Sequence, residues 1–252
     1  MEWCKVNNMS LNPSKSTCMT IASSYKLTSL SPLQLKVNSQ PLSNVSIQKI
    51  LGVYVDNKLN WHAQIDSVCR KLNTKIALLK NIIYYLNEKM KLLYYNSYIL
   101  PVFDYGCVVW GHGSNTYRNK ISSIQRRAAR IILAKSRGST KTDLFHDLHW
   151  LSFDDRCRYH TALLIYKTVH NLSPIYMNDI LIFSENKYHT LRSQSNNNLA
   201  LTYKPRTNYM LNSFRYFGFK VWNSIPSYIK HSTSIVSFKR NYKKYLLEKV
   251  PY

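Results

Sequence analysis

Asp154 and Asp155 are the one pair of adjacent carboxylates in the sequence, and paired carboxylates can hold the metal ions of phosphoryl transfer. The pair follows Phe153 and stands just before Arg156 and a run of residues with helical spacing. At the start of a helix, unpaired backbone N–H groups and the helix dipole favour carboxylates. We therefore interpret the pair as a helix cap and predict no catalytic residue in the chain. Asp56 is likewise interpreted as a turn residue.

A second candidate site combines His146-x-x-His149 with Cys157-x-x-His160, four residue types that bind zinc within a short stretch. His149 lies on an apolar stretch, however, and residues 159–169 have helical spacing of their own. We therefore expect these side chains to lie in the core or on helix surfaces, and we predict no metal site.

Arginines form the strongest candidate binding surface. The helix predicted around residues 117–131 carries Tyr117, Ile121, Ile124, Ala128 and Ile131 on one face and four arginines on the other, namely Arg118, Arg126, Arg127 and Arg130. Arg126 and Arg130 are one turn apart, with Arg127 beside them. Three more basic residues extend the patch: Lys135, Arg137 and Lys141. A ladder of this kind fits the phosphates along a nucleic-acid strand. The alternative is a solvated cationic face.

The bulk charge favours the same partner. The 252 residues include 35 Lys and Arg against 12 Asp and Glu, for a formal net charge of +23. Such a chain repels itself, and nucleic acid would relieve the repulsion. Twenty tyrosines interleave with the basic residues and could stack on bases, although most have the helical spacing of core packing. Because the basic residues do not gather on one amphipathic helix, we expect no membrane partner.

Cysteine usage indicates a reducing, intracellular environment. The five cysteines are an odd number without a C-x-x-C pair, which argues against a disulfide framework. We expect no signal peptide, because no long apolar run follows the N-terminus. Residues 92–110 are apolar enough to resemble a membrane span, but Asn96, Pro101 and Asp104 favour a buried helix that breaks near Pro101.

Hydrophobic spacing divides the chain into a mixed part and a helical part. Short strands are predicted at residues 18–22, 33–37 and 47–55, and apolar residues recur every three or four positions after residue 60. The predicted helices cover residues 65–86, 87–100, 117–131, 142–148, 154–170, 213–222 and 235–245. Pro174 is expected to open a further short helix, and residues 184–210 to form a loop.

Two segments in the mixed part follow extended patterns. The first, W-x-x-x-N-x-L-x-L-N-x-x-K-[TS], is matched by Trp3, Asn7, Leu11, Asn12, Lys15 and Ser16, with Met9 at its first leucine. The second is a Leu-Gly-Val stretch followed by D-x-x-L-x-W-x-x-H-I, matched by Leu51, Gly52, Val53, Asp56, Leu59, Trp61 and Ile65. Gln64 stands at its histidine position, and His62 lies two residues earlier.

Three more segments follow in the helical part. P-x-x-x-Y-G-x-x-x-W-G is matched by Pro101, Tyr105, Gly106, Trp110 and Gly111. [LI]-Q-x-x-A-x-R-x-I is matched by Ile124, Gln125, Ala128, Arg130 and Ile132. The last, an aromatic W-N-x-[LI]-P run followed by S-x-x-x-F-K, is matched by Phe214, Trp222, Asn223, Ile225, Pro226, Ser234, Phe238 and Lys239. In this order the five segments resemble the C-terminal part of the reverse transcriptase of a non-LTR (LINE-type, jockey-like) retrotransposon.

The resemblance implies an α+β fold in three parts. Residues 1–60 would be a small β-containing palm remnant, residues 61–183 a helical thumb-like region, and residues 184–252 a C-terminal loop with helices. In the family the catalytic aspartates precede the first segment, so the resemblance implies a chain truncated after them. It would then lack the ligands for the Mg²⁺ of the intact enzyme and need no cofactor.

Two site roles are also implied by the resemblance. Lys15 corresponds to the palm-motif lysine near the departing pyrophosphate, and Leu51, Gly52 and Val53 correspond to the primer grip. The alternatives are a solvated lysine and an ordinary tight hairpin with glycine at the bend.

The expected function is therefore that of an RNA-directed DNA polymerase fragment, inactive alone, that still binds RNA or an RNA–DNA hybrid. Its partners would be template RNA, primer DNA and the missing half of the palm, and the family implies nuclear access. The alternatives are a host-retained RNA-associated structural protein without polymerase activity and a non-functional product of a decayed element.

Overall fold

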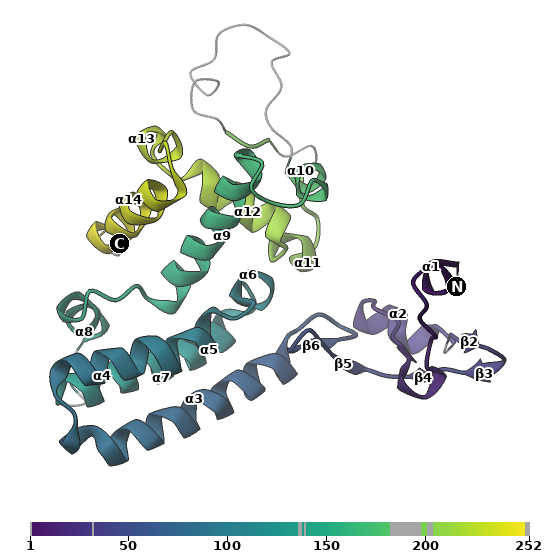
Figure 1. Ribbon diagram of the computed structural model, residues 1–252, viewed down its shortest axis with the longest axis horizontal. Coiled ribbons are helices and arrows are strands. Elements are labelled where there is room, and N and C mark those ends of the chain that lie inside the picture. The colour runs from purple at the N-terminus through teal and green to yellow at the C-terminus, as the bar shows by residue number, and fades with distance from the viewer. Residues whose placement is uncertain are drawn as a thin grey trace, which may run out of the picture. The chain divides into compact units, whose positions relative to one another are not determined.

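The computed structural model describes residues 2–31, 33–135, 138, 140–181, 198–200 and 204–249, without the side chains of Lys5, Lys141, Thr142 and Asp143. Most of these residues are helical and the strands are few and short (Figure 1), so the predicted α+β class is confirmed. The chain divides into two compact units, residues 1–67 and 68–252.

The first unit consists of short elements. They are α1 (Glu2–Val6), the 3-10 turn η1 (Pro13–Lys15), β1 (Thr17–Cys18), α2 (Ser24–Ser29), β2 (Lys36–Val37), β3 (Gln40–Pro41), β4 (Ser43–Asn44), β5 (Ile47–Ile50) and β6 (Val53–Asp56). β1 pairs with β4 in parallel, whereas β2–β3 and β5–β6 are antiparallel pairs. The strands predicted at 18–22 and 33–37 are therefore mostly wrong. β1 and β2 pair with β4 and β3, which are only two residues long, so their hydrogen-bonded ladders end after two residues.

The segment predicted as one strand, residues 47–55, is instead the β5–β6 hairpin. Its turn has φ 47° at Leu51 and φ 86° at Gly52. Two positive φ values match the two-residue turns whose twist suits a hairpin. Glycine adopts this conformation freely, whereas leucine does so at a steric cost. The turn places the Leu51 side chain at the hairpin tip, 88% exposed.

Asp56 organises the loop between β6 and α3 (His62–Ile82), as predicted for a turn residue. Its buried carboxylate accepts hydrogen bonds of 2.8–3.1 Å from the backbone N–H groups of Lys58, Asn60 and Trp61. These bonds hold a loop in which Leu59 and Trp61 both have positive φ. Gln64, at the histidine position of the pattern, is buried and accepts a 3.0 Å bond from the Tyr54 N–H.

We expect weak hydrogen-exchange protection between Cys18 and Val55. Two-stranded ladders leave backbone groups free on their outer edges. Among the described residues of the first unit, only Cys18 and Ile65 are buried apolar side chains. Exchange followed by mass spectrometry on the whole chain measures this, with the long helix at residues 153–169 as internal reference. Equal protection in the two segments would contradict the expectation.

The second unit is built from helices. After α3 come the 3-10 turn η2 (Ile83–Tyr85), α4 (Glu88–Tyr94), the π-helical turn η3 (Tyr95–Ile99), α5 (Leu100–Asp104), α6 (Cys107–Trp110), α7 (Asn115–Leu133), α8 (Lys141–Asp147), α9 (Phe153–Val169), α10 (Tyr176–Ile180), α11 (Asn208–Leu211), α12 (Phe214–Asn223), α13 (Ser227–Lys230) and α14 (Ile235–Glu248). The predicted helices are thus largely confirmed. Pro174 lies before α10 rather than inside it, and its carbonyl accepts a bond from the Met177 N–H.

The helix predicted to break near Pro101 continues past it to Asp104. The π-helical turn η3 lies directly before α5, and Pro101 occupies the first turn of α5, where a missing N–H is tolerated. In the part of the chain that the structure describes, no helix combines the length and the apolar character needed to cross a membrane.

The turn after α5 explains the proline–tyrosine–glycine–tryptophan pattern. Gly106 has φ 64°, which glycine adopts without strain. Trp110 is fully buried, and its indole N–H donates a 2.9 Å bond back to the Tyr105 carbonyl. Gly111 has no room for a side chain, because a Cβ would stand 2.4 Å from both the Cys107 carbonyl oxygen and the Cys157 Sγ.

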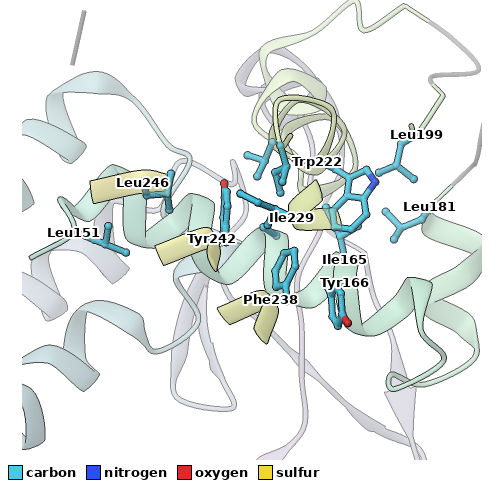
Figure 2. Close-up of a cluster of buried hydrophobic side chains, with 13 residues drawn as sticks. Leu151, Ile165, Tyr166, Leu181, Leu199, Trp222, Ile229, Phe238, Tyr242 and Leu246 are labelled. Carbon is cyan, nitrogen blue, oxygen red and sulfur yellow. The ribbon is translucent and has the colours of Figure 1, made fainter. Parts of the chain in front are cut away.

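The main core lies where α12 and α14 pack on α9 (Figures 1 and 2). Trp222, Phe238 and Tyr242 are almost completely buried there, with Ile165 and Tyr166 of α9. Figure 2 shows Leu181 and Leu199 beside the Trp222 ring. This core therefore joins residues on both sides of position 184.

Asn223, the asparagine of the W-N-x-[LI]-P pattern at the end of α12, binds a distant segment of the chain. Its side-chain amide exchanges two hydrogen bonds, of 2.9 and 3.0 Å, with the backbone of Leu199. Ile225 is buried, and Pro226 precedes α13. The loop predicted at 184–210 is partly wrong, because α11 begins at Asn208. Residues 182–197 and 201–203 lie outside the described residues.

Candidate nucleic-acid interface

α7 divides into a buried and a polar face, as its spacing predicts. Ile121, Ile124 and Ala128 are buried as expected, together with Ser122, Gln125, Ala129 and Ile132. Tyr117 and Ile131 are only half-buried. Gln125 donates a 3.0 Å bond to the Leu151 carbonyl, so a polar residue belongs to the inner face.

The α7 basic patch consists of Arg126, Arg127 and Arg130 on the opposite side. Arg127 is exposed and the other two are half-buried. The Arg127 guanidinium donates to the neutral amide of Asn73 on α3. Arg126 and Arg130 form no ion pair within the described part of the chain, and their Nε atoms are buried without an acceptor there.

Carboxylates of this unit neutralise other basic side chains. Asp154 pairs with Arg118 at 3.3 Å, Asp104 with Arg156, Asp155 with Arg158 at 3.9 Å, and Asp147 with Lys135. Arg118 lies on the polar face of the predicted helix but outside the patch, and Asp154 of α9 offsets its charge. Among the described residues, no carboxylate pairs with the three arginines of the α7 basic patch. Their guanidinium groups retain hydrogen-bond donors that suit phosphate oxygens.

The predicted extension of the patch is described only in part. Lys135 donates to Asp147, and this contact holds the pKa of the Asp147 carboxyl below its ordinary value. Arg137 lies outside the described residues, as does the side chain of Lys141. Their binding roles stay predictions.

The two sites implied by the palm patterns lie in the first unit. Lys15 is exposed and ends η1, a turn capped by Asn12, whose Oδ1 accepts a 3.0 Å bond from the Ser14 N–H. Among the described residues Lys15 has no ion-pair partner. Leu51, Gly52 and Val53 form the tip and the first residue after the tip of the β5–β6 hairpin.

The adjacent carboxylates belong to a helix start, as predicted. Ser152 is the capping residue of α9: its Oγ accepts a 3.2 Å bond from the Asp155 N–H and donates one of 2.6 Å to the Asp155 carboxylate. Asp154 turns instead to Arg118. Asp154 and Asp155 thus lie in the first turn, and a serine rather than an aspartate caps the helix.

The donor set does not fit the Mg²⁺ ions of the intact family enzyme. Within the ranges that the structure describes, no three His, Cys, Asp or Glu side chains lie close enough to hold a metal ion. Two of the candidate zinc ligands have other neighbours. Cys157 is buried against Cys107 and Gly111, and His160 lies 3.3 Å from Asp104.

Asp104, Arg156 and His160 form a cluster that is not among the sites expected from the sequence. Arg156 forms two hydrogen bonds to the Asp104 carboxylate, one of them 2.6 Å long. Burial by itself raises the pKa of Asp104, but His160 and Arg156 together outweigh it and hold that pKa below its ordinary value. The spacing of Arg156 and His160, one helical turn apart, was the available signal. The cluster ties α5 to α9.

His112 is a buried histidine in the same unit. Its ring stacks on Phe217 with centroids 3.5 Å apart, and its Nε2 lies 3.3 Å from the Thr161 hydroxyl. Burial, followed by the charges of Arg118 and Arg158, lowers the pKa of His112 to about 3. The ring is therefore neutral at physiological pH.

We expect His112 to make the chain acid-sensitive. In the unfolded chain the histidine is protonated below a pKa of about 6.5, whereas the folded protein resists protonation. Its contribution is fully present above that pH and is lost on acidification, at up to about 1.4 kcal/mol per pH unit. Urea unfolding at pH 7 and pH 5 should show about 2 kcal/mol more loss for the wild type than for His112→Gln. His146→Gln, at a largely exposed histidine, is the control. Identical losses in wild type and His112→Gln would refute this account.

Curated proteins similar to the chain are RNA-directed DNA polymerases of transposable elements. The chain is 26% identical over 164 residues to the probable RNA-directed DNA polymerase from transposon X-element of Drosophila melanogaster. It is 26% identical over 168 residues to that from transposon BS and over 134 residues to that from mobile element jockey, both of the same organism. The predicted resemblance to LINE-type reverse transcriptases is confirmed by these matches.

The similarity is partial on both sides. It covers 64%, 64% and 52% of this chain and 18%, 18% and 14% of the three relatives. The chain therefore spans less than a fifth of the length of the curated relatives it matches. The FAINT family model, described as a domain of unknown function (DUF529), matches residues 179–249. No solved structure gives a significant match.

Proposed function

We propose that the chain is a nucleic-acid-holding part of a LINE-type reverse transcriptase. It binds RNA or an RNA–DNA hybrid, and the α7 basic patch is its main contact. The main observation behind this proposal is that Arg126, Arg127 and Arg130 lie on one face of α7 without a carboxylate partner among the described residues. Arginine forks placed along a helix neutralise successive phosphates and release their counterions. The similarity to RNA-directed DNA polymerases supports the same partner.

The chain holds nucleic acid without extending it. Two-metal catalysis needs convergent carboxylates, whereas Asp56, Asp104, Asp154 and Asp155 are engaged in loop, cap and ion-pair contacts. The partners are template RNA, primer DNA and a polypeptide that carries the catalytic carboxylates of the palm. The proposed place of action is the nucleus, where a nicked DNA target would be found.

The palm-like sites take supporting roles in this proposal. In this proposal Lys15 stabilises negative charge on a phosphate group near the palm. Leu51, exposed at the hairpin tip, contacts the end of a primer. Each role needs the catalytic half to be present.

Alanine at both Arg126 and Arg130 should reduce the salt dependence of RNA binding. If each arginine touches one phosphate, the slope of log K against log salt falls in magnitude by about 1.8. Fluorescence anisotropy with a labelled RNA at several salt concentrations measures the slope. The matched control is Lys243→Ala with Lys244→Ala, two exposed cations on α14.

An unchanged slope in the arginine variant, with RNA still bound, would remove the α7 basic patch from the interface. A control variant that loses as much slope as the arginine variant would show that total charge, rather than this face, determines binding.

A further inference from the structure

The turn that joins α3 to α4 lies at the lower left of Figure 1 and is called here the α3–α4 corner. It carries two tyrosines whose rings do not pack in the core. Tyr84 and Tyr85 lie in the 3-10 turn η2 and are 91% and 87% exposed. Neither ring contacts another ring or a cation in the described part of the chain. Tyr95 and Tyr242 of this unit are buried, and its other exposed tyrosines among the described residues, such as Tyr228 at 69%, are less exposed than these two.

The turn that carries these rings is well anchored. Ile83 is buried beneath them, and the Leu86 N–H donates a 3.3 Å bond to its carbonyl. Asn87 then caps α4, its side chain accepting a 2.9 Å bond from the Met90 N–H. Consecutive residues of a 3-10 helix point roughly 120° apart, so the two rings offer separate faces.

The side chains around the α3–α4 corner are mostly positively charged, which suits the binding of a polyanion. Lys80, Lys89 and Lys91 flank the tyrosines, and none of them has an ion-pair partner within the described ranges. Glu88 is the one acidic residue between positions 67 and 103. A second copy of a chain with a net charge of +23 would be repelled by such a surface.

We infer that the α3–α4 corner is a stacking platform for a single-stranded nucleic acid. Bases stack on the rings of Tyr84 and Tyr85, and the flanking lysines neutralise the adjoining phosphates. The inference deepens the proposed function and rests on it. Asn73, which the α7 basic patch contacts, lies about 16 Å from Tyr84 along α3, so one strand of several nucleotides can reach both surfaces.

The test compares a labelled single-stranded RNA with an abasic strand of the same length and charge. The whole chain should bind the strand with bases more tightly. Tyr84→Ala with Tyr85→Ala should weaken that binding by about fivefold or more per tyrosine while leaving the abasic strand and the salt slope unchanged. Tyr84→Phe with Tyr85→Phe should retain it, because stacking does not need the hydroxyl. Tyr228→Ala, at an exposed tyrosine of α13, is the control.

The outcomes separate this inference from the proposed function. If the wild type binds neither strand, the proposed function fails and the platform with it. If it binds both strands equally, or if the alanine variant still prefers the strand with bases, the platform is refuted while phosphate binding stands. Loss of self-association in the alanine variant with unchanged RNA binding would assign the corner to a second copy of the chain and overturn the inference.

Discussion

Replacing Trp222 by alanine is expected to lower the free energy of unfolding by about 3–5 kcal/mol. The indole is fully buried where α9, α12 and α14 meet, and its centroid lies 6.2 Å from that of Phe238 (Figure 2). Truncation leaves a cavity that this aromatic cluster cannot close, in addition to the lost burial of the ring. Urea unfolding followed by circular dichroism measures the change.

The matched control for this prediction is Trp3→Ala, because Trp3 is exposed in the first unit. It should change the free energy of unfolding by less than about 0.5 kcal/mol. A loss at Trp222 no larger than that at Trp3 would show that the cluster is not the core of the second unit.

Alanine at Gly111 is expected to cost about 3 kcal/mol, the upper range for overpacking. The added Cβ would stand 2.4 Å from a backbone oxygen of Cys107 and from the Cys157 Sγ. The carbonyl belongs to the backbone of α6 and cannot rotate away, so the end of α6 must distort, and the Cys157 thiol on α9 must shift as well. The same unfolding measurement applies.

A second variant isolates the steric cause at Gly111. In a Cys157→Ala background one of the two clashing atoms is gone, so Gly111→Ala should cost less there than in the wild type. An equal cost in both backgrounds would exclude a clash with the thiol, and a neutral Gly111→Ala would contradict the packing altogether.

Helices were predictable because their apolar residues recur at the helical period. Ile65, Leu72 and Leu79 on α3 are all buried, as their spacing indicates. The β5–β6 hairpin was predicted only as the alternative to a primer grip, with glycine at the bend. Nothing in the residue pattern shows that Leu51, just before that glycine, also adopts a positive φ.

The basic face of α7 was predictable from the sequence only up to its boundaries. Spacing places Arg118 on the same face as Arg126 and Arg130, but the partner of Arg118 lies 36 positions away on α9. Which arginines lack a carboxylate partner therefore depends on tertiary contacts that no local sequence pattern contains. The exposure of Tyr84 and Tyr85 could not be predicted either, because nothing in their sequence surroundings distinguishes them from tyrosines that are buried.

The residues shared with the family patterns mostly serve the scaffold. Trp110 and Trp222 fill the interior, Gly111 permits a close helix contact, and Asn223 holds a distant backbone segment. Arg130 differs from these residues and resembles Lys15, because it belongs to a pattern and has no ion-pair partner in the part of the chain described. This contrast is consistent with the binding role proposed for Arg130.

Protection of individual arginines from phenylglyoxal by bound RNA tests the central claim most directly. Peptide mass spectrometry on the whole chain gives the modification rate of each arginine with and without saturating RNA. The account predicts that RNA slows modification of Arg126, Arg127 and Arg130 more than that of Arg240, an exposed arginine on α14. Unchanged rates in the α7 basic patch, with Arg240 protected, would contradict it.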